Sequence, residues 1–189
     1  MVNVYVNCPE FENEKLLIRR TEKGDRDDLL KVYSDEKAVP FFNGDNCHGD
    51  DFHYTTPQQM EQAMDFWEQS YRDGWFVRFT VICKGSNSAI GTTELFRRNA
   101  DNGGTGVLRL DLRSDYERED VILSLLSLII PHAYELFNCK CIITKGFPDS
   151  SDRLSALEKY GFKKSSDKLI GEDGTEYSDY FAIKYKSAL

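Results

Sequence analysis

Residues 107–162 read VLRLDLRSDYEREDVILSLLSLIIPHAYELFNCKCIITKGFPDSSDRLSALEKYGF, and this stretch decides the fold. Alternating leucines from Val107 to Leu112 predict a strand with one leucine face. The segment from Val121 to Ile130 is nearly all apolar, which predicts a helix buried on more than one side. Cys139 to Thr144 predict a second strand, and Ser150 to Tyr160 a closing helix. Two strands that are each followed by a helix are typical of an α/β domain.

The rest of the chain adds strands and helices around this stretch. The patterns predict, in chain order, a strand at Lys15 to Arg20, a helix capped by Asp25, a helix that starts at Thr56-Pro57-Gln58-Gln59, a hairpin of Phe76 to Cys83 with Ala89 to Arg97, and a last strand from Asp179 to Lys186. The start at Thr56 combines a capping threonine, a proline in the first turn and a glutamine three residues on, which is a capping box. Asn43 to Thr55 reads as a polar loop between the first two helices. Trp67 and Trp75 are expected to be core aromatics.

Length and composition are those of one globular domain spanning residues 1–189. The chain is 40% hydrophobic and 13% aromatic, which suits a packed core, and its net charge of −8 argues against a nucleic-acid-binding protein. Met1 to Glu14 lacks the basic and apolar regions of a signal peptide, and no apolar run approaches the ~20 residues of a membrane span. We therefore expect a cytoplasmic protein without nucleic-acid or membrane partners.

The cysteines also indicate a reducing compartment. The chain has five of them, without a regular framework spacing, which fits a reduced protein better than a disulfide scaffold. Cys139 and Cys141 fall on one face of a predicted strand and are expected to be core thiols. We predict that all five thiols are free and that none binds a metal.

Several short motifs, taken in their order along the chain, carry a family resemblance. They are Leu16-Leu17-Ile18-Arg19, Ser34-Asp35-Glu36 with Val39, Ala89-Ile90-Gly91, Tyr116, and Glu158-Lys159-Tyr160-Gly161-Phe162. Together they resemble the acetyltransferases of the GNAT superfamily, in the RimJ/RimL-type branch that acetylates protein N-termini, over roughly residues 15 to 165. The resemblance implies an α/β (α+β) GNAT fold, with a central mixed, mostly antiparallel twisted sheet flanked by helices.

The resemblance also implies acetyl-CoA as a co-substrate, bound where the strand ending at Leu112 turns into the apolar helix. The residues at the implied contact positions are Leu112, Arg113, Glu117, Arg118, Glu119, Asp120, Val121, Ile122 and Ser150. The family has an arginine or glutamine and then glycines in this turn, whereas here the first position is Glu117 and the glycine positions are Arg118, Asp120 and Ile122. In the last helix, the family's asparagine, serine and tyrosine positions are Ser150, Arg153 and Leu157.

Two interpretations of this glycine-free turn remain open. A helix N-terminus attracts a phosphate, but a side-chain carboxylate can occupy the same place. Ser114 and Glu117 match a capping box, and Glu119 and Asp120 would then satisfy the helix dipole in place of a ligand. Alternatively, Arg118 and the main-chain amides still hold a phosphate.

Glu94 and Asp111 are the two carboxylates placed to act as the base that the GNAT reaction needs to deprotonate its amine. Either is equally well explained as a solvated strand residue or as an ion-pair partner of Arg97 or Arg109. Glu94 is preferred, because Leu95 and Phe96 beside it indicate partial burial, which makes a carboxylate more basic.

One polar loop concentrates potential ligand side chains: Asp45, Cys47, His48, Asp50, Asp51 and His53. Their spacing matches no zinc pattern, so no metal site is predicted. The loop connects the first two helices, and the resemblance implies that it borders the acceptor pocket, where it would form an acidic lip that attracts an amine.

The sequence therefore favours an enzyme, an acyl-CoA-dependent N-acetyltransferase in which a peptide N-terminus or small-molecule amine attacks the thioester directly. The alternative is a catalytically reduced GNAT-like module that binds a ligand or partner without acyl transfer. The glycine-free turn distinguishes them. A homodimer and a monomer both stay open.

Overall fold

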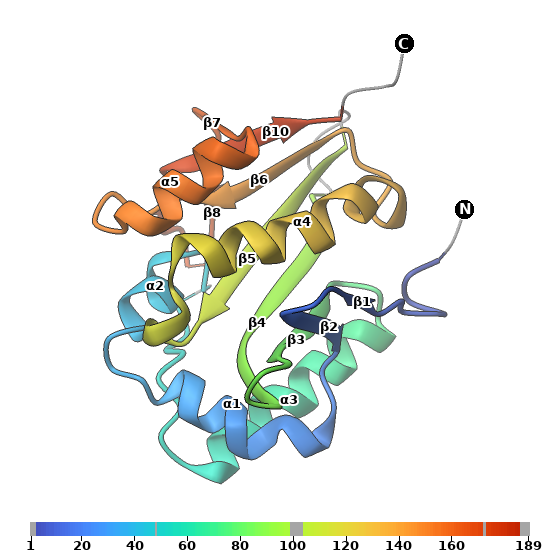
Figure 1. Ribbon diagram of the computed structural model, residues 1–189, viewed down its shortest axis with the longest axis vertical. Coiled ribbons are helices and arrows are strands. Elements are labelled where there is room, and N and C mark those ends of the chain that lie inside the picture. Colours follow the sequence, from blue (N-terminus) through green and yellow to red (C-terminus); the bar gives the residue numbers. More distant parts are fainter. Residues whose placement is uncertain (1–2, 48, 99–103, 172, 186–189) are drawn as a thin grey trace.

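The protein is described by a computed structural model that covers residues 3–47, 49–98, 104–171 and 173–185. Its centre is an eight-stranded sheet in the order β1-β2-β3-β4-β5-β6-β10-β7 (Figure 1). The strands are β1 (Phe11–Glu12), β2 (Leu16–Arg20), β3 (Val77–Cys83), β4 (Ser88–Arg97), β5 (Thr105–Leu112), β6 (Cys141–Lys145), β7 (Lys163–Lys164) and β10 (Tyr180–Lys184). A separate hairpin pairs β8 (Leu169–Ile170) with β9 (Glu176–Tyr177). In the sheet, β5 and β6 pair in parallel, and the other neighbouring strands pair antiparallel over the described residues.

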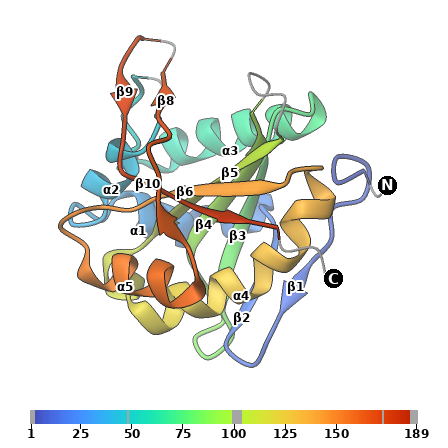
Figure 2. The same cartoon turned by 90° about the horizontal axis from the view of Figure 1, so that it is seen from above.

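Helices cover both faces of this sheet. They are α1 (Arg26–Tyr33), α2 (Val39–Gly44), α3 (Pro57–Arg72), α4 (Glu119–Leu136) and α5 (Ser151–Tyr160). α4 and α5 lie on one face and α3 on the other (Figure 2). The buried apolar side chains form one core between the sheet and α4, a second core around α1 and α3, and a third, smaller one where β5, β6 and β10 meet the β8–β9 hairpin. None of the helices in the described ranges is long and apolar enough to cross a membrane.

Most of the predicted elements are confirmed. The mixed, mostly antiparallel sheet flanked by helices is present, and the hairpin of β3 and β4 has the predicted boundaries within a residue. The predicted start of α3 is also confirmed, because the Thr56 side chain accepts a hydrogen bond from the Gln59 amide and the Gln59 side chain returns to the Thr56 amide. The apolar run of α4 continues as helix through Pro131.

Three local predictions need correction. Asp25 is the N-cap residue of α1, as predicted, but its carboxylate makes no capping bond, because it binds the Arg19 guanidinium at 2.7 and 2.9 Å. The segment from Val39 to Gly44, which runs into the predicted polar loop, is the helix α2. Trp67 is buried as predicted, but Trp75 is 59% exposed. The last strand ends at Lys184, and Lys186 lies outside the described residues.

All five cysteines lie in the described ranges, and no disulfide joins any two of them there. Cys141 begins β6, whereas Cys139 precedes the strand, so the prediction that both lie in it is wrong. Cys139 is nevertheless buried, and burial raises the pKa of its thiol to about 11. That thiol is therefore an unreactive core group at neutral pH.

β5 is buried over nearly its whole length, and its two faces carry different side chains. Leu108, Leu110 and Leu112 pack into the core under α4, as their alternation predicts. Arg109 and Asp111 point to the opposite face, toward α1 and α2. The parallel pairing with β6 ends at Leu108 opposite Thr144, and beyond this point the two strands diverge (Figure 1).

Candidate functional site

Four charged side chains meet on the face of the sheet that α1 and α3 cover. Arg78 donates to Glu94 at 2.6 Å and to Asp111 at 2.9 Å, and Arg109 donates to Asp111 at 2.9 Å. The register explains this meeting, because Arg78 lies opposite Glu94, and Glu94 opposite Arg109, on three adjacent strands. Side chains of directly opposed residues share one face of a sheet. We call these four residues the charge network.

Asp111 is the closed end of the charge network. Its side chain is 1% exposed and also accepts a hydrogen bond from the Tyr33 hydroxyl at 3.0 Å. Burial alone would raise the pKa of Asp111, but the guanidiniums of Arg109 and Arg78 hold it below the ordinary value. Asp111 is therefore ionised at neutral pH, and its carboxylate anchors two arginines. This arrangement matches the alternative interpretation of Asp111 as an ion-pair partner of Arg109.

Glu94 is the open end of the charge network. It lines a cavity of about 510 Å³ between the sheet, α3 and the segment after α2, which we call the inner cavity. Aromatic side chains form much of its wall, among them Phe52, Phe66 and Trp75. Glu94 is 9% exposed, and its contact with Arg78 engages Oε2.

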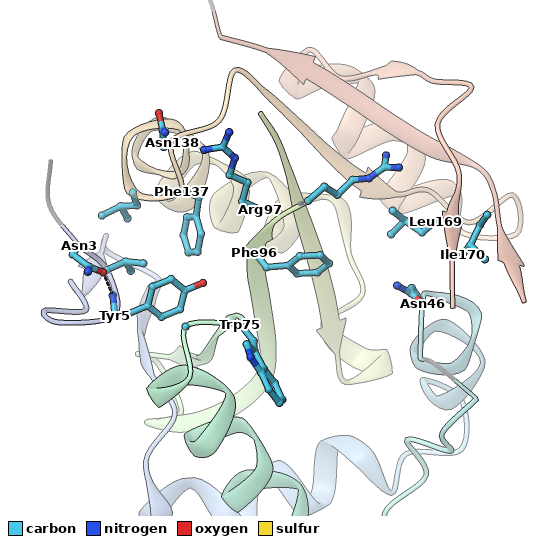
Figure 3. A pocket seen from close by; sticks show the side chains of 14 residues that line it. Asn3, Tyr5, Asn46, Trp75, Phe96, Arg97, Phe137, Asn138, Leu169 and Ile170 are labelled. Atoms are coloured by element: carbon cyan, nitrogen blue, oxygen red, sulfur yellow. Dashed lines mark hydrogen bonds between the residues drawn. The ribbon is translucent and has the colours of Figure 1, made fainter. Parts of the chain in front are cut away.

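A second, more open cavity of about 720 Å³ lies beside the first, and Figure 3 shows the side chains that line it. The two share Asn46, Trp75, Phe96 and Leu169 as lining residues. Figure 3 shows the Phe96 ring between the side chains of Arg97 and Asn46. The two cavities therefore adjoin at these residues, and we call the second one the outer cavity.

The predicted acidic lip coincides with part of the inner cavity wall. Asp45 and Asp50 line the cavity, and the Asp45 carboxylate accepts a hydrogen bond from the Tyr180 hydroxyl at 2.6 Å. Asp51 points elsewhere and binds the Asn43 side chain at 2.8 Å. His48 lies outside the described residues, and within the described ranges no three His, Cys, Asp or Glu side chains come close enough to hold a metal.

The predicted acetyl-CoA residues gather around the end of β5, but several contact other side chains of the chain. Glu117 and Ser150 come together, with the Ser150 hydroxyl 3.4 Å from Glu117 Oε1. Both also bind Arg153: the Ser150 hydroxyl accepts from its amide, and the Glu117 carboxylate accepts from its guanidinium. Glu119 accepts hydrogen bonds from Ser155 and Lys159 in α5, both at 2.6 Å.

The remaining residues of the turn divide between surface and core. Arg118 donates to Asp120 at 3.1 Å, and both side chains are about half exposed, at 55% and 51%. Val121 and Ile122 are buried under the sheet, and Leu112 ends β5. Arg113 pairs with Asp115 at 2.7 Å.

The predicted capping box of Ser114 and Glu117 is wrong. Ser114 to Tyr116 form a short 3-10 turn, and α4 begins at Glu119 with Arg118 as its N-cap and no side-chain capping bond. The Ser114 amide binds Asp35 at 2.8 Å, and Glu117 turns inward to Arg153.

Sequence reasoning did not assign Arg78 or Tyr33 to the site, and it treated Arg153 only as a replaced position. A signal for Arg78 was available: it interrupts the apolar strand Val77–Cys83, and a buried guanidinium requires a carboxylate partner. Arg153 gave a weaker signal, because an arginine in the first turn of a helix is normally solvated.

Comparisons with known proteins agree with this architecture. The family described as "Acetyltransferase (GNAT) domain" matches residues 15–163. Among curated proteins, a search finds no match. The fold is similar to a GNAT-family acetyltransferase from Bacillus anthracis, with a TM-score of 0.67 and 16% identity over 93% of this chain and 98% of that one.

Two further solved structures carry more specific titles. The ribosomal-protein-S5-alanine acetyltransferase from Vibrio fischeri has a TM-score of 0.68 and 16% identity over 95% of this chain and 98% of that one. RimJ from Mycobacterium smegmatis, in complex with CoA-disulfide, has a TM-score of 0.68 and 13% identity over 93% of this chain and 86% of that one. At these identities the structures show a shared fold. The family match covers most of the sequence, and the chain therefore belongs to the GNAT acetyltransferase family.

Proposed function

We propose that this chain is an amine N-acetyltransferase whose acceptor enters the inner cavity and loses its proton to Glu94. The family transfers an acetyl group from acetyl-CoA to an amine, so the substrate class follows from membership. The observation that carries the proposal is that Glu94, alone of the two candidate carboxylates, faces a cavity large enough for a ligand.

The charges and rings of the inner cavity suit a cationic amine. Its lining includes the carboxylates of Asp45, Asp50 and Glu94 against the guanidiniums of Arg78 and Arg109, an excess of one negative charge. Both guanidiniums also bind Asp111 behind the wall, so the local field favours a cation. Aromatic faces add cation–π attraction for an ammonium group, on the order of 1 kcal/mol.

Glu94 has the role of base in this proposal. An ammonium group must lose a proton before its nitrogen can act as a nucleophile. Arg78 binds Glu94 through Oε2, which fixes the carboxylate plane, and we assign the proton transfer to Oε1. Asp111 orients Arg78 and Arg109 and has the role of a positioning residue.

The residues at the donor side do not fit acetyl-CoA as they stand. The turn before α4 has no glycine, and the divergence of β5 and β6 contains the Arg153 side chain, which is 1% exposed. This arrangement supports the second candidate function, a GNAT-like module that binds an amine ligand without acyl transfer. The two candidates share the inner cavity and differ in turnover.

Amine binding is tested by calorimetric titration with three probes of similar shape: 2-phenylethylamine, 2-phenylethanol and phenylacetate. We expect the cation to bind tightest and the anion weakest. Glu94→Gln should remove at least ~10-fold of the preference for the amine over the alcohol, about 1.4 kcal/mol. Glu61→Gln, a matched change on the exposed face of α3, should leave it unaltered. Equal binding of amine and alcohol by the wild type would refute the cationic acceptor.

Turnover is tested by the release of free CoA thiol from millimolar acetyl-CoA with a panel of amines and short peptides. Glu94→Gln should lower turnover ~10²-fold or more, the usual contribution of a general base. Unchanged turnover in Glu94→Gln, with loss in Asp111→Asn, would move the base to Asp111. Amine binding without thiol release at any acetyl-CoA concentration would establish the binding module.

A further inference from the structure

The main chain of β5 beyond its pairing with β6 faces an opening in the sheet. The Arg113 amide donates to the Ile90 carbonyl of β4 at 2.9 Å. Main-chain groups of successive strand residues point to opposite edges, so those of Leu110 and Leu112 point toward β6. Pairing with β6 ends at Leu108, so no strand in the described ranges covers Leu110 or Leu112 on that side.

Arg153 of α5 fills this opening. Its Nη2 donates to the Leu110 carbonyl at 3.0 Å, which places the guanidinium against the uncovered edge of β5. The same guanidinium holds Glu117 through Nε–Oε1 at 2.5 Å and Nη2–Oε2 at 2.7 Å. The two side chains are 1% and 6% exposed, so the pair is sealed from solvent.

Aromatic rings hold Arg153 in place from two other elements. Its Cζ lies 5.1 Å from the Phe147 ring centroid and 5.8 Å from that of Phe41. Phe147 precedes α5, and Phe41 belongs to α2, so the guanidinium lies between elements far apart in sequence. Gly44 closes on Phe147 so tightly that a Cβ there would lie 2.8 Å from Cε1 of the ring.

We infer that Glu117 and Arg153 form an internal plug, which fills the acyl-donor opening in this conformation and must be displaced before acetyl-CoA can enter. The pair gives Arg153 both a charge partner and a main-chain acceptor, so a neutral thioester chain offers the guanidinium nothing that would replace the lost ion pair. The plug also explains the glycine-free turn, because a loop that holds no pyrophosphate has no need of close main-chain approach.

Two substitutions to residue types found in the family would remove the plug. The family residues at these two positions are glutamine or arginine in place of Glu117 and serine in place of Arg153. Glu117→Gln with Arg153→Ser therefore empties the opening and leaves no unpaired buried charge. Glu117→Gln with Arg153→Met removes the same charges but keeps a long side chain in the opening, and it is the matched control.

The experiment is calorimetric titration of the full chain with acetyl-CoA and with S-acetylpantetheine, which lacks the nucleotide. The wild type should bind both thioesters only weakly, with a dissociation constant above about 1 mM. The double variant Glu117→Gln/Arg153→Ser should bind both thioesters at least ~10-fold tighter, whereas the methionine control should match the wild type.

Two results would overturn the plug. One is low-micromolar binding of acetyl-CoA by the wild type, and the other is a folded Glu117→Gln/Arg153→Ser protein with no gain. If that variant does not fold, Glu117→Gln with Arg153→Val opens the site with an apolar, smaller side chain and is subject to the same criterion. The inference does not rest on the proposed amine acceptor, because the 2-phenylethylamine titration reports on that cavity independently.

Discussion

Two buried clusters of charge lie against β5, and they differ in what borders them. On the α1 and α3 face, the charge network of Arg78, Glu94, Arg109 and Asp111 lies beside a cavity of about 510 Å³. At the β6 edge, the pair of Glu117 and Arg153 fills its own site and is covered by rings. Buried arginine–carboxylate pairs therefore border a cavity on one face of the sheet and fill the opening at the β6 edge.

The difference separates the two halves of an acetyl transfer. In the assignment proposed above, the acceptor half has a carboxylate, Glu94, that reaches a cavity, whereas the donor half has the Arg153 side chain where a thioester would enter. Buried ion pairs are weak evidence for stability, but each of them fixes a unique arrangement of the strands or helices that it joins. The comparison therefore predicts that damage to the charge network affects folding most, and that damage to the plug changes which ligand fits.

Among the charged residues, the largest expected effect is that of Asp111→Asn. It removes the anion that two buried guanidiniums share, and breaking a buried pair by removing one partner costs about 3–5 kcal/mol. Urea denaturation followed by circular dichroism measures this loss. Asp115→Asn is the matched control, because its exposed pair with Arg113 should contribute about 1 kcal/mol or less. Similar losses in both variants would contradict the central position of Asp111.

Glu117→Gln should cost less free energy of unfolding than Asp111→Asn. Arg153 keeps the Leu110 carbonyl and gains an amide oxygen, so we expect about 2–3 kcal/mol. Adding Arg153→Met should recover most of this loss, since the cation left unpaired is then gone. A double-mutant cycle measures the coupling, and additive effects would mean that the two side chains act independently.

Acid should weaken the charge network. The guanidiniums lower the pKa of Asp111 in the folded protein, so its contribution to stability is complete above the unfolded pKa of ~3.9 and is lost as pH falls through the folded value. Stability should therefore decline below about pH 4, by about 1.4 kcal/mol for each unit between the two pKa values. Asp111→Asn should flatten this decline relative to Asp115→Asn when thermal unfolding is followed at several pH values.

The elements with strong periodicity were predictable from the sequence. The leucine alternation of β5 and the apolar run of α4 each determine a buried face regardless of distant partners. The capping box at Thr56 is likewise local, and it formed as predicted.

The site features that the sequence did not predict depend on contacts between residues far apart in the chain. Arg78 meets Asp111 across 33 residues, and Arg153 meets Glu117 across 36. No local pattern specifies such a partner, although a cation inside an apolar strand signals that one exists. The local sequence predicts that Glu117 caps the helix. In the structure its carboxylate instead accepts hydrogen bonds from the buried Arg153 guanidinium.

Asp120→Gly should have a smaller effect and distinguishes the turn from the plug. Asp120 sits in the first turn of α4, so losing its dipole contact and adding glycine's backbone entropy should cost about 0.5–1 kcal/mol. In the wild-type background it should not improve acetyl-CoA binding, since Arg153 still fills the opening. With Glu117→Gln/Arg153→Ser it should improve binding further. A gain from Asp120→Gly alone would assign the exclusion to the turn instead.

Trp75→Ala should have the smallest effect on the free energy of unfolding. Trp67→Ala is its control, because Trp67 borders the same cavity but is buried. Trp75 is 59% exposed, so Trp75→Ala should change the free energy of unfolding by no more than about 0.5 kcal/mol. Trp67 is 4% exposed, and its ring centroid lies 4.7 Å from the Arg78 Cζ, so Trp67→Ala should cost about 3–5 kcal/mol. Since an aromatic face is worth on the order of 1 kcal/mol to a cation, Trp75→Ala should weaken 2-phenylethylamine binding about fivefold without unfolding the protein. If Trp75→Ala binds 2-phenylethylamine as tightly as the wild type does, the amine stays beside Glu94 and does not reach Trp75, where the two cavities adjoin.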